Sequence, residues 1–303
     1  MPRDREDGAM SVRTRFAVLL SAAVCLGALA ACGSDQTAED PSPASGSTQG
    51  RAESSAPSEP SESAAETVAV PVYFVGDTPQ GPRLYREFRQ VPADDPAAGA
   101  LALMTSGDAL DPDYRTLYPG GSFAGVQVDA DPIVVELPDE SWTTAPDGMS
   151  QDDARLAAQQ LVYTLQGVAQ ARKPVAIRLD GAPADLFGLG GELADEPELD
   201  VRALVNVTSP EEGATVSGTF TASGVSSSFE ATTPWEVRAE DGTVAAKGFA
   251  TAEGWMDKLY PWETEVDVSD LEPGTYTFVA MTDDPSGGEG HGPTEDTKTI
   301  TVQ

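Results

Sequence analysis

The chain has 303 residues and a formal net charge of −32, from 18 basic and 50 acidic side chains. Nucleic-acid binding depends on clustered lysines and arginines that displace counterions, so this composition excludes nucleic acid as a partner. It also disfavours a polybasic contact with anionic lipid.

The N-terminus has the order of a secretion signal. Four arginines lie within residues 1–15, an uncharged and mostly apolar run follows over 16–31, and small residues precede Cys32. This is the order of the charged region, apolar region and cleavage site of an exported protein. The run is shorter than the roughly 20 apolar residues that a membrane span needs.

The segment Leu29-Ala30-Ala31-Cys32 resembles the lipobox of bacterial lipoproteins. The resemblance implies cleavage between Ala31 and Cys32 and a diacylglyceryl thioether on Cys32. Membrane lipid is then one partner, and the protein lies on the extracytoplasmic face of the cell membrane. The alternative is a chance cysteine in a plain signal peptide or an uncleaved anchor. A start at Met10 instead of Met1 leaves the mature chain unchanged.

Cleavage before Cys32 removes Cys25 with the signal peptide, residues 1–31. A single lipidated cysteine remains, which excludes an intramolecular disulfide, a thiolate metal site and a cysteine nucleophile. Residues 33–66 contain no aromatic side chain and are rich in Ser, Ala, Pro and Glu. We expect residues 32–67 to form a disordered acidic tether, because such a composition cannot bury enough apolar surface to fold.

An α+β domain is predicted over residues 68–187. Apolar and alternating patterns predict strands over 68–75 and 84–91, with a turn at 79–82. Asp94 or Asp95 is positioned to cap a helix that runs from Pro96 to about Thr105.

The rest of this domain alternates strand and helix signals. Runs at 123–128 and 133–137 predict a hairpin. Ser150 is positioned to cap a long helix that stops at Lys173-Pro174, and 175–179 is the closing strand.

This order of elements resembles a GerMN domain, the sporulation and spore-germination module. The matching pieces are Val134-Val135-Glu136-Leu137 and Ile177-Arg178-Leu179-Asp180-Gly181. The resemblance implies a module of the cell envelope to which no enzymatic activity is attached.

Residues 188–202 are rich in glycine and acidic residues and predict a second linker. Seven short β runs follow within residues 203–303, separated by turn signals, as in an immunoglobulin-like β-sandwich. They cover 203–210, 216–223, 235–239, 243–251, 263–268, 275–281 and 297–302.

Tyr276 follows Pro273-Gly274 and predicts a tyrosine corner, in which the hydroxyl group returns to upstream backbone. The stretches 205–210 and 228–231 resemble the immunoglobulin-like domain of bacterial spore germination. That family often follows GerMN domains, so each resemblance supports the other.

Few residues suggest chemistry. His291 lies in a glycine-rich loop, where an exposed polar role is the simpler explanation. The acidic pairs Asp94-Asp95 and Asp152-Asp153 are best explained as helix starts. Asp283-Asp284 with Glu289 offers oxygen ligands for calcium, but the spacing matches no known loop. We expect no catalytic residue, no metal and no cofactor.

The best binding candidate is the aromatic segment with Trp255, Tyr260 and Trp262, whose rings could stack on sugars. The alternative is that Trp262 and Leu259 fill the core of the sandwich, and Trp235 is expected in that core too.

The sequence therefore predicts a non-enzymatic lipid-anchored envelope protein that presents two domains to an envelope protein or to cell-wall polymer. A wall-glycan binding module is one alternative. A wall hydrolase using acidic side chains is the least supported.

Overall fold

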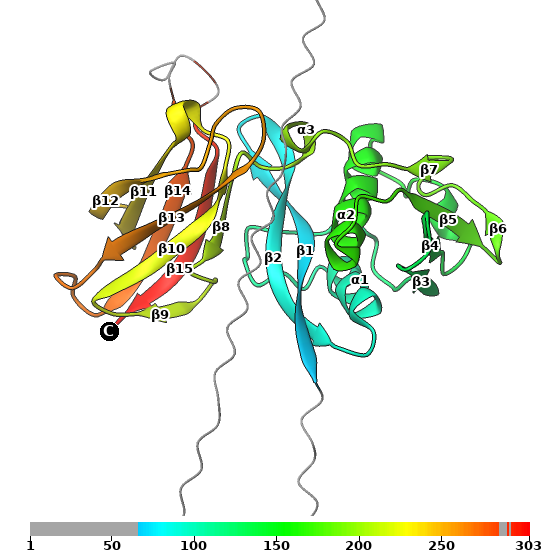
Figure 1. Ribbon diagram of the computed structural model, residues 1–303, viewed down its shortest axis with the longest axis horizontal. Coiled ribbons are helices and arrows are strands. Elements are labelled where there is room, and N and C mark those ends of the chain that lie inside the picture. Colours follow the sequence, from blue (N-terminus) through cyan, green and yellow to red (C-terminus); the bar gives the residue numbers. More distant parts are fainter. Residues whose placement is uncertain (1–65, 285–289, 291) are drawn as a thin grey trace, which may run out of the picture. The chain divides into compact units, whose positions relative to one another are not determined.

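The computed structural model describes residues 66–284, 290 and 292–303 (Figure 1). The predicted signal peptide, Cys32 and the tether up to residue 65 lie outside these residues, as do Glu289 and His291. Thr67, the last residue of the predicted tether, already belongs to the first strand. The described residues belong to one compact unit, Ser61–Gln303, which contains an α+β domain followed by an all-β sandwich.

The α+β domain begins with a two-stranded antiparallel ribbon. Strand β1, Thr67–Thr78, pairs with β2, Gly81–Pro92, so that Phe74 lies opposite Tyr85. Both strands were predicted, and both are longer than their apolar patterns. One face of the ribbon carries Val72 and Phe74, which are fully buried in the main core.

Two helices pack on this ribbon. Helix α1, Pro96–Ser106, is capped by the Asp95 side chain, which accepts a hydrogen bond from Ala98 N. Helix α2, Gln151–Ala169, begins with a capping box between Ser150 and Asp153. These caps confirm that the two acidic pairs mark helix starts. Helix α2 ends earlier than predicted, because Gln170 takes a left-handed conformation before Lys173-Pro174 is reached.

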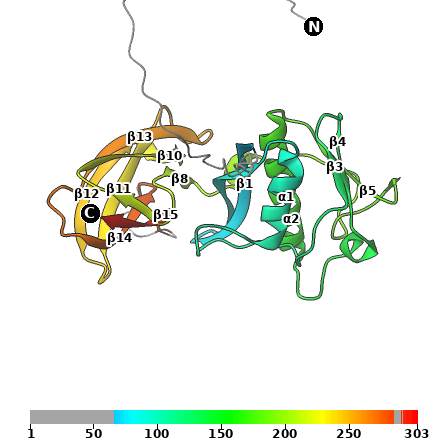
Figure 2. The same cartoon turned by 90° about the horizontal axis from the view of Figure 1, so that it is seen from below.

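A small mixed sheet forms the third layer, so that the helices lie between the ribbon and the sheet (Figure 2). The predicted hairpin is present as two antiparallel strands, and the second of them runs parallel to the closing strand across α2. The strands are β3 Gly125–Gln127, β4 Ile133–Glu136, β5 Val175–Leu179, β6 Ala182–Pro183 and β7 Glu192–Leu193. A 3-10 turn, η1 Glu140–Thr143, places Trp142 in the same core.

The segment predicted as a free linker is instead part of the fold. Leu193 in β7 pairs with Val175 of β5 and is buried. Val201, in the short helix α3 Glu198–Val201, packs with Tyr73 and Tyr163. A few apolar residues among many acidic ones are enough to dock this segment, so composition alone misled the prediction.

The second domain is a sandwich of two sheets. Its three-stranded sheet has the order β13-β10-β8, and its five-stranded sheet has the order β12-β11-β14-β15-β9. All seven predicted strands are present, and β9 is an additional short strand parallel to β15. The bounds are β8 Val205–Ser209, β9 Ala214–Val216, β10 Thr219–Ser226, β11 Thr232–Ala239, β12 Val244–Thr251, β13 Tyr260–Asp267, β14 Gly274–Met281 and β15 Glu295–Val302, with a 3-10 turn η2 at Phe229–Ala231.

Two predicted packing features of the sandwich are confirmed. The Tyr276 hydroxyl donates to Glu272 O at 3.0 Å, which is the expected tyrosine corner. Trp235 is buried and its ring lies 6.2 Å from that of Phe278, within the core.

Gly224 in β10 is a place where only glycine fits. A Cβ atom at this position would lie 2.7 Å from Cζ2 of Trp262 and would overlap Asn206 O. We therefore expect Gly224→Ala to lower the free energy of unfolding by about 1–3 kcal/mol, the usual cost of overpacking a filled core.

Urea unfolding measures this effect, and Gly125→Ala is the matched control. The nearest neighbour of a Cβ atom at Gly125 is 4.0 Å away, so that variant is expected to unfold like the parent chain. Equal stability of the two variants would contradict the packing at Gly224.

Candidate functional site

The predicted aromatic segment forms an exposed apolar tip at one end of the sandwich. Trp255 and Met256 are 47% and 58% exposed. The Trp255 ring meets the Phe229 ring edge to face, with centroids 5.4 Å apart. Phe229 comes from η2, and the sequence prediction did not include it among the binding residues.

The tip does not include the other two predicted aromatic residues. Trp262 is only 3% exposed and packs in the sandwich core, as the alternative prediction had it, so it does not present an open ring beside Trp255. Tyr260 is half-covered: its ring lies against Gly254 on the backbone side, and Lys258 Nζ lies 4.7 Å from the ring centroid. Trp255 is thus the most exposed of the three predicted rings.

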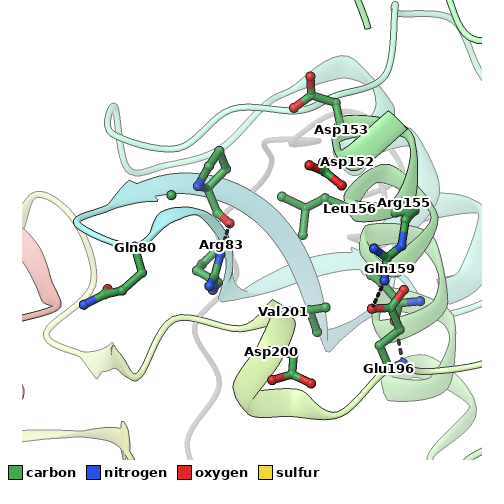
Figure 3. Close-up of a pocket in the computed structure, with 12 residues that line it drawn as sticks. Gln80, Arg83, Asp152, Asp153, Arg155, Leu156, Gln159, Glu196, Asp200 and Val201 are labelled. Carbon is green, nitrogen blue, oxygen red and sulfur yellow. Dashed lines mark hydrogen bonds and ion pairs between the residues drawn. The ribbon is translucent and has the colours of Figure 1, made fainter. Parts of the chain in front are cut away.

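A second candidate site is a hollow in the α+β domain, with a volume of about 470 Å³ (Figure 3). The turn of the ribbon supplies Gln80 and Arg83, the start of α2 supplies Asp152 and Leu156, and α3 closes the other side with Asp200 and Val201.

Several polar side chains around this hollow are already engaged with other groups of the protein. Arg155 pairs with Glu196 at 2.9 Å, and Gln159 bonds to backbone at both ends of its amide. The hollow offers polar groups of both signs over a small apolar patch, which suits binding rather than a defined reaction.

Metal chemistry finds no support in the residues that the structure describes. Within 66–284, 290 and 292–303, no three His, Cys, Asp or Glu side chains gather closely enough to hold an ion. The third residue of the calcium hypothesis, Glu289, lies outside the described residues.

A buried charged cluster joins the α+β domain to the sandwich, and the sequence prediction missed it. Lys298 Nζ of β15 donates to Asp111 Oδ2 at 2.5 Å, to Asp296 Oδ1 at 2.9 Å and to the Tyr114 hydroxyl at 2.8 Å. Asp111 and Tyr114 belong to the loop after α1. All four side chains are buried.

Further hydrogen bonds complete the cluster. Asp296 Oδ1 also accepts from the Tyr114 hydroxyl at 2.6 Å, and its Oδ2 accepts from Asn206 Nδ2 and Val207 N. Tyr85 stacks on Tyr114 with centroids 4.8 Å apart and donates to Glu295 O. A buried charge is tolerated only when its partners are this complete.

The same environment shifts the pKa values of the cluster. Burial raises the pKa of Asp111 to about 6, although Lys298 opposes the shift. Burial also acts to lower the pKa of Lys298, but Asp296 and Asp111 outweigh it and the net shift is upward. Burial, followed by Asp296, raises the pKa of the Tyr114 hydroxyl.

The raised pKa of Asp111 predicts a pH dependence of stability. The folded chain holds a proton on Asp111 that the unfolded chain has released, between about pH 4 and pH 6. The contribution of Asp111 to stability is therefore present at low pH and is lost as the pH rises through about 6.

Urea unfolding at pH 4.5 and pH 7.0 measures this for the parent chain and for Asp111→Asn. We expect the parent to lose stability relative to Asp111→Asn as the pH rises. Asp270→Asn, at an exposed position, is the control and should keep a constant difference from the parent. A constant difference for Asp111→Asn as well would contradict the shifted pKa.

Two family models match the chain. The model described as sporulation and spore germination matches residues 71–185, and the model described as the immunoglobulin-like domain of bacterial spore germination matches residues 204–289. No curated protein matches the chain.

Solved structures give distant likenesses. The tandem GerMN domains of the sporulation protein GerM from Bacillus subtilis share 16% identity, with a TM-score of 0.35, over 67% of this chain and 62% of that one. An engineered protein shares 16% identity, with a TM-score of 0.25, over 49% of this chain and 36% of that one. A lytic polysaccharide monooxygenase from Jonesia denitrificans shares 15% identity, with a TM-score of 0.21, over 31% of this chain and 60% of that one.

This chain covers less than two thirds of each of these structures, and every TM-score is below 0.5, so the family models alone carry the assignment. They match the α+β domain and the sandwich in chain order. The chain contains a sporulation and spore germination domain of the GerMN type, followed by an immunoglobulin-like domain of bacterial spore germination.

Proposed function

We propose that this chain is a lipid-anchored, non-enzymatic protein of the cell envelope that presents its two domains to another envelope protein or to cell-wall polymer. The observation that carries the proposal is the order of its parts. A lipobox-like segment ending at Cys32 precedes a polar tether, and two germination-type domains follow.

The descriptions of both families support a role in sporulation or germination rather than in a reaction. Anchoring through Cys32 would leave the folded unit on the outer side of the membrane. No helix among the described residues has both the length and the apolar character to cross a membrane.

Cys32→Ala tests the anchor, and Cys25→Ala is a matched control because Cys25 lies inside the predicted signal. In a bacterium that processes lipoproteins, we expect Cys32→Ala to lose incorporation of an alkyne-tagged fatty acid and to leave the membrane fraction. Cys25→Ala should keep both the label and the membrane fraction, since only Cys32 is expected to carry the thioether.

Label on the Cys32→Ala protein, or its retention in the membrane fraction, would contradict the lipid anchor. Release of peptidoglycan fragments by the purified chain would contradict a non-enzymatic role.

The exposed tip supports a second candidate function, binding of cell-wall glycan. The Trp255 ring is 47% exposed and stands perpendicular to the Phe229 ring, and exposed aromatic faces stack on the apolar faces of sugars.

Retention of the purified chain on isolated cell walls tests this function. We expect Trp255→Ala to weaken retention by about tenfold, which corresponds to the loss of one stacked ring. Phe249→Ala is the control, because Phe249 is exposed on the outer side of β12 and forms no ring contact with Trp255 or Phe229 among the described residues. Equal retention of the two variants would reject the tip as a glycan site.

A further inference from the structure

Arg86 in β2 is a cation without an anion. Six of the other eight arginines of the described residues form ion pairs: Arg89, Arg115, Arg155, Arg172, Arg202 and Arg238. The remaining two, Arg83 and Arg178, donate to backbone carbonyl groups instead. Within the described residues no carboxylate oxygen lies within 4.0 Å of Arg86, and its Nε is buried without a hydrogen-bond partner.

The groups around Arg86 do not replace an anion. Nη2 donates a long hydrogen bond of 3.3 Å to Thr208 Oγ1, and the guanidinium lies 4.6 Å from the centre of the Phe88 ring. Burial lowers the pKa of Arg86, and Arg202 adds to this effect, while Tyr73 and the more distant carboxylate of Glu198 offset part of it. Burying a guanidinium without a counter-charge is costly, so this side chain is in an environment suited to receiving an anion.

Arg86 lines a groove between β2 and the three-stranded sheet, with a volume of about 570 Å³. The hydroxyl groups of Thr208, Ser223 and Thr251 line it as well, and so do the carboxylates of Glu253 and Glu263. The volume is in the range of small-molecule sites, which is about 300–1,000 Å³.

These side chains restrict the ligand. One guanidinium can hold one carboxylate through two parallel hydrogen bonds. Glu253 and Glu263 would repel a dianion or a polyanion, but they can accept hydrogen bonds from hydroxyl groups. The hydroxyl side chains add further partners for a ligand rich in hydroxyl groups.

We propose that the groove binds a sugar acid, whose single carboxylate is held by Arg86 and whose hydroxyl groups meet Thr208, Ser223, Glu253 and Glu263. The site is separate from the Trp255 tip and does not depend on the lipid anchor. Its ligand would be a single acidic sugar unit with one carboxylate.

Titration of the purified chain with glucuronate, glucose and inorganic phosphate tests the proposal. The readouts are calorimetry and the NMR signal of the Arg86 Nε–H group, which its burial protects from exchange. We expect saturable binding of glucuronate with a shift of this signal, and much weaker responses to glucose and to phosphate. Arg86→Gln should lower the affinity for glucuronate by about tenfold or more.

Arg83→Gln is the matched control, because Arg83 lies on the same strand but lines the hollow of Figure 3. It should keep the parent affinity. Should Arg86→Gln fail to fold, Arg86→Lys keeps the charge but not the planar pair of donors, and a weaker affinity is expected for it too.

Three results would overturn the proposal. The first is the lack of saturable glucuronate binding by the parent chain, and the second is equal binding of glucose or phosphate. The third is a loss of binding in Arg83→Gln that equals the loss in Arg86→Gln.

Discussion

The junction of the two domains depends on the buried ion pairs that Lys298 forms with Asp111 and Asp296. Alternate residues of β15 point to the inner side of the sandwich, and Ile300 and Val302 fill its apolar core. Asp296 and Lys298 lie on the same inner face of β15. Their partners there are not apolar side chains of the sandwich but Asp111 and Tyr114 of the GerMN-type domain. The first domain thus completes the environment of the second.

This arrangement gives the junction directional bonds instead of a general apolar contact. Removing any one partner from a buried ion pair leaves an uncompensated charge, which costs about 3–5 kcal/mol, whereas an apolar contact tolerates change more gradually. The Tyr114 ring strengthens the junction in two further ways. It stacks on Tyr85, and its centre lies 4.6 Å from Lys298 Nζ. The two domains are therefore expected to respond as one body when a partner binds either of them.

Local signals in the sequence were enough for the main helices and strands, but not for the docked segment 188–202 or for the sites. Caps at Asp95 and Ser150 and the corner at Tyr276 depend on neighbours within a few residues, so short patterns reveal them. The burial of Trp262 depends on Gly224, about forty positions away along the chain. Lys298 alternates with threonines in β15, which does not distinguish it from a solvent-facing lysine, and its partner Asp111 is 187 positions distant. Without the topology, such pairs cannot be found.

The charged cluster and the Arg86 groove are connected through one side chain. Asn206 of β8 donates from Nδ2 to Asp296 Oδ2 at 3.0 Å, and its Oδ1 accepts from the backbone N of Arg86 at 2.8 Å. The cluster therefore fixes β2 against β8, and the groove exists only while the domains are joined. A ligand that binds the groove only in the joined state would stabilise that state by mass action, and its apparent affinity would fall in proportion to the fraction of joined molecules that is lost. Asn206 thus links the charged cluster of the junction to the backbone of the strand that carries Arg86.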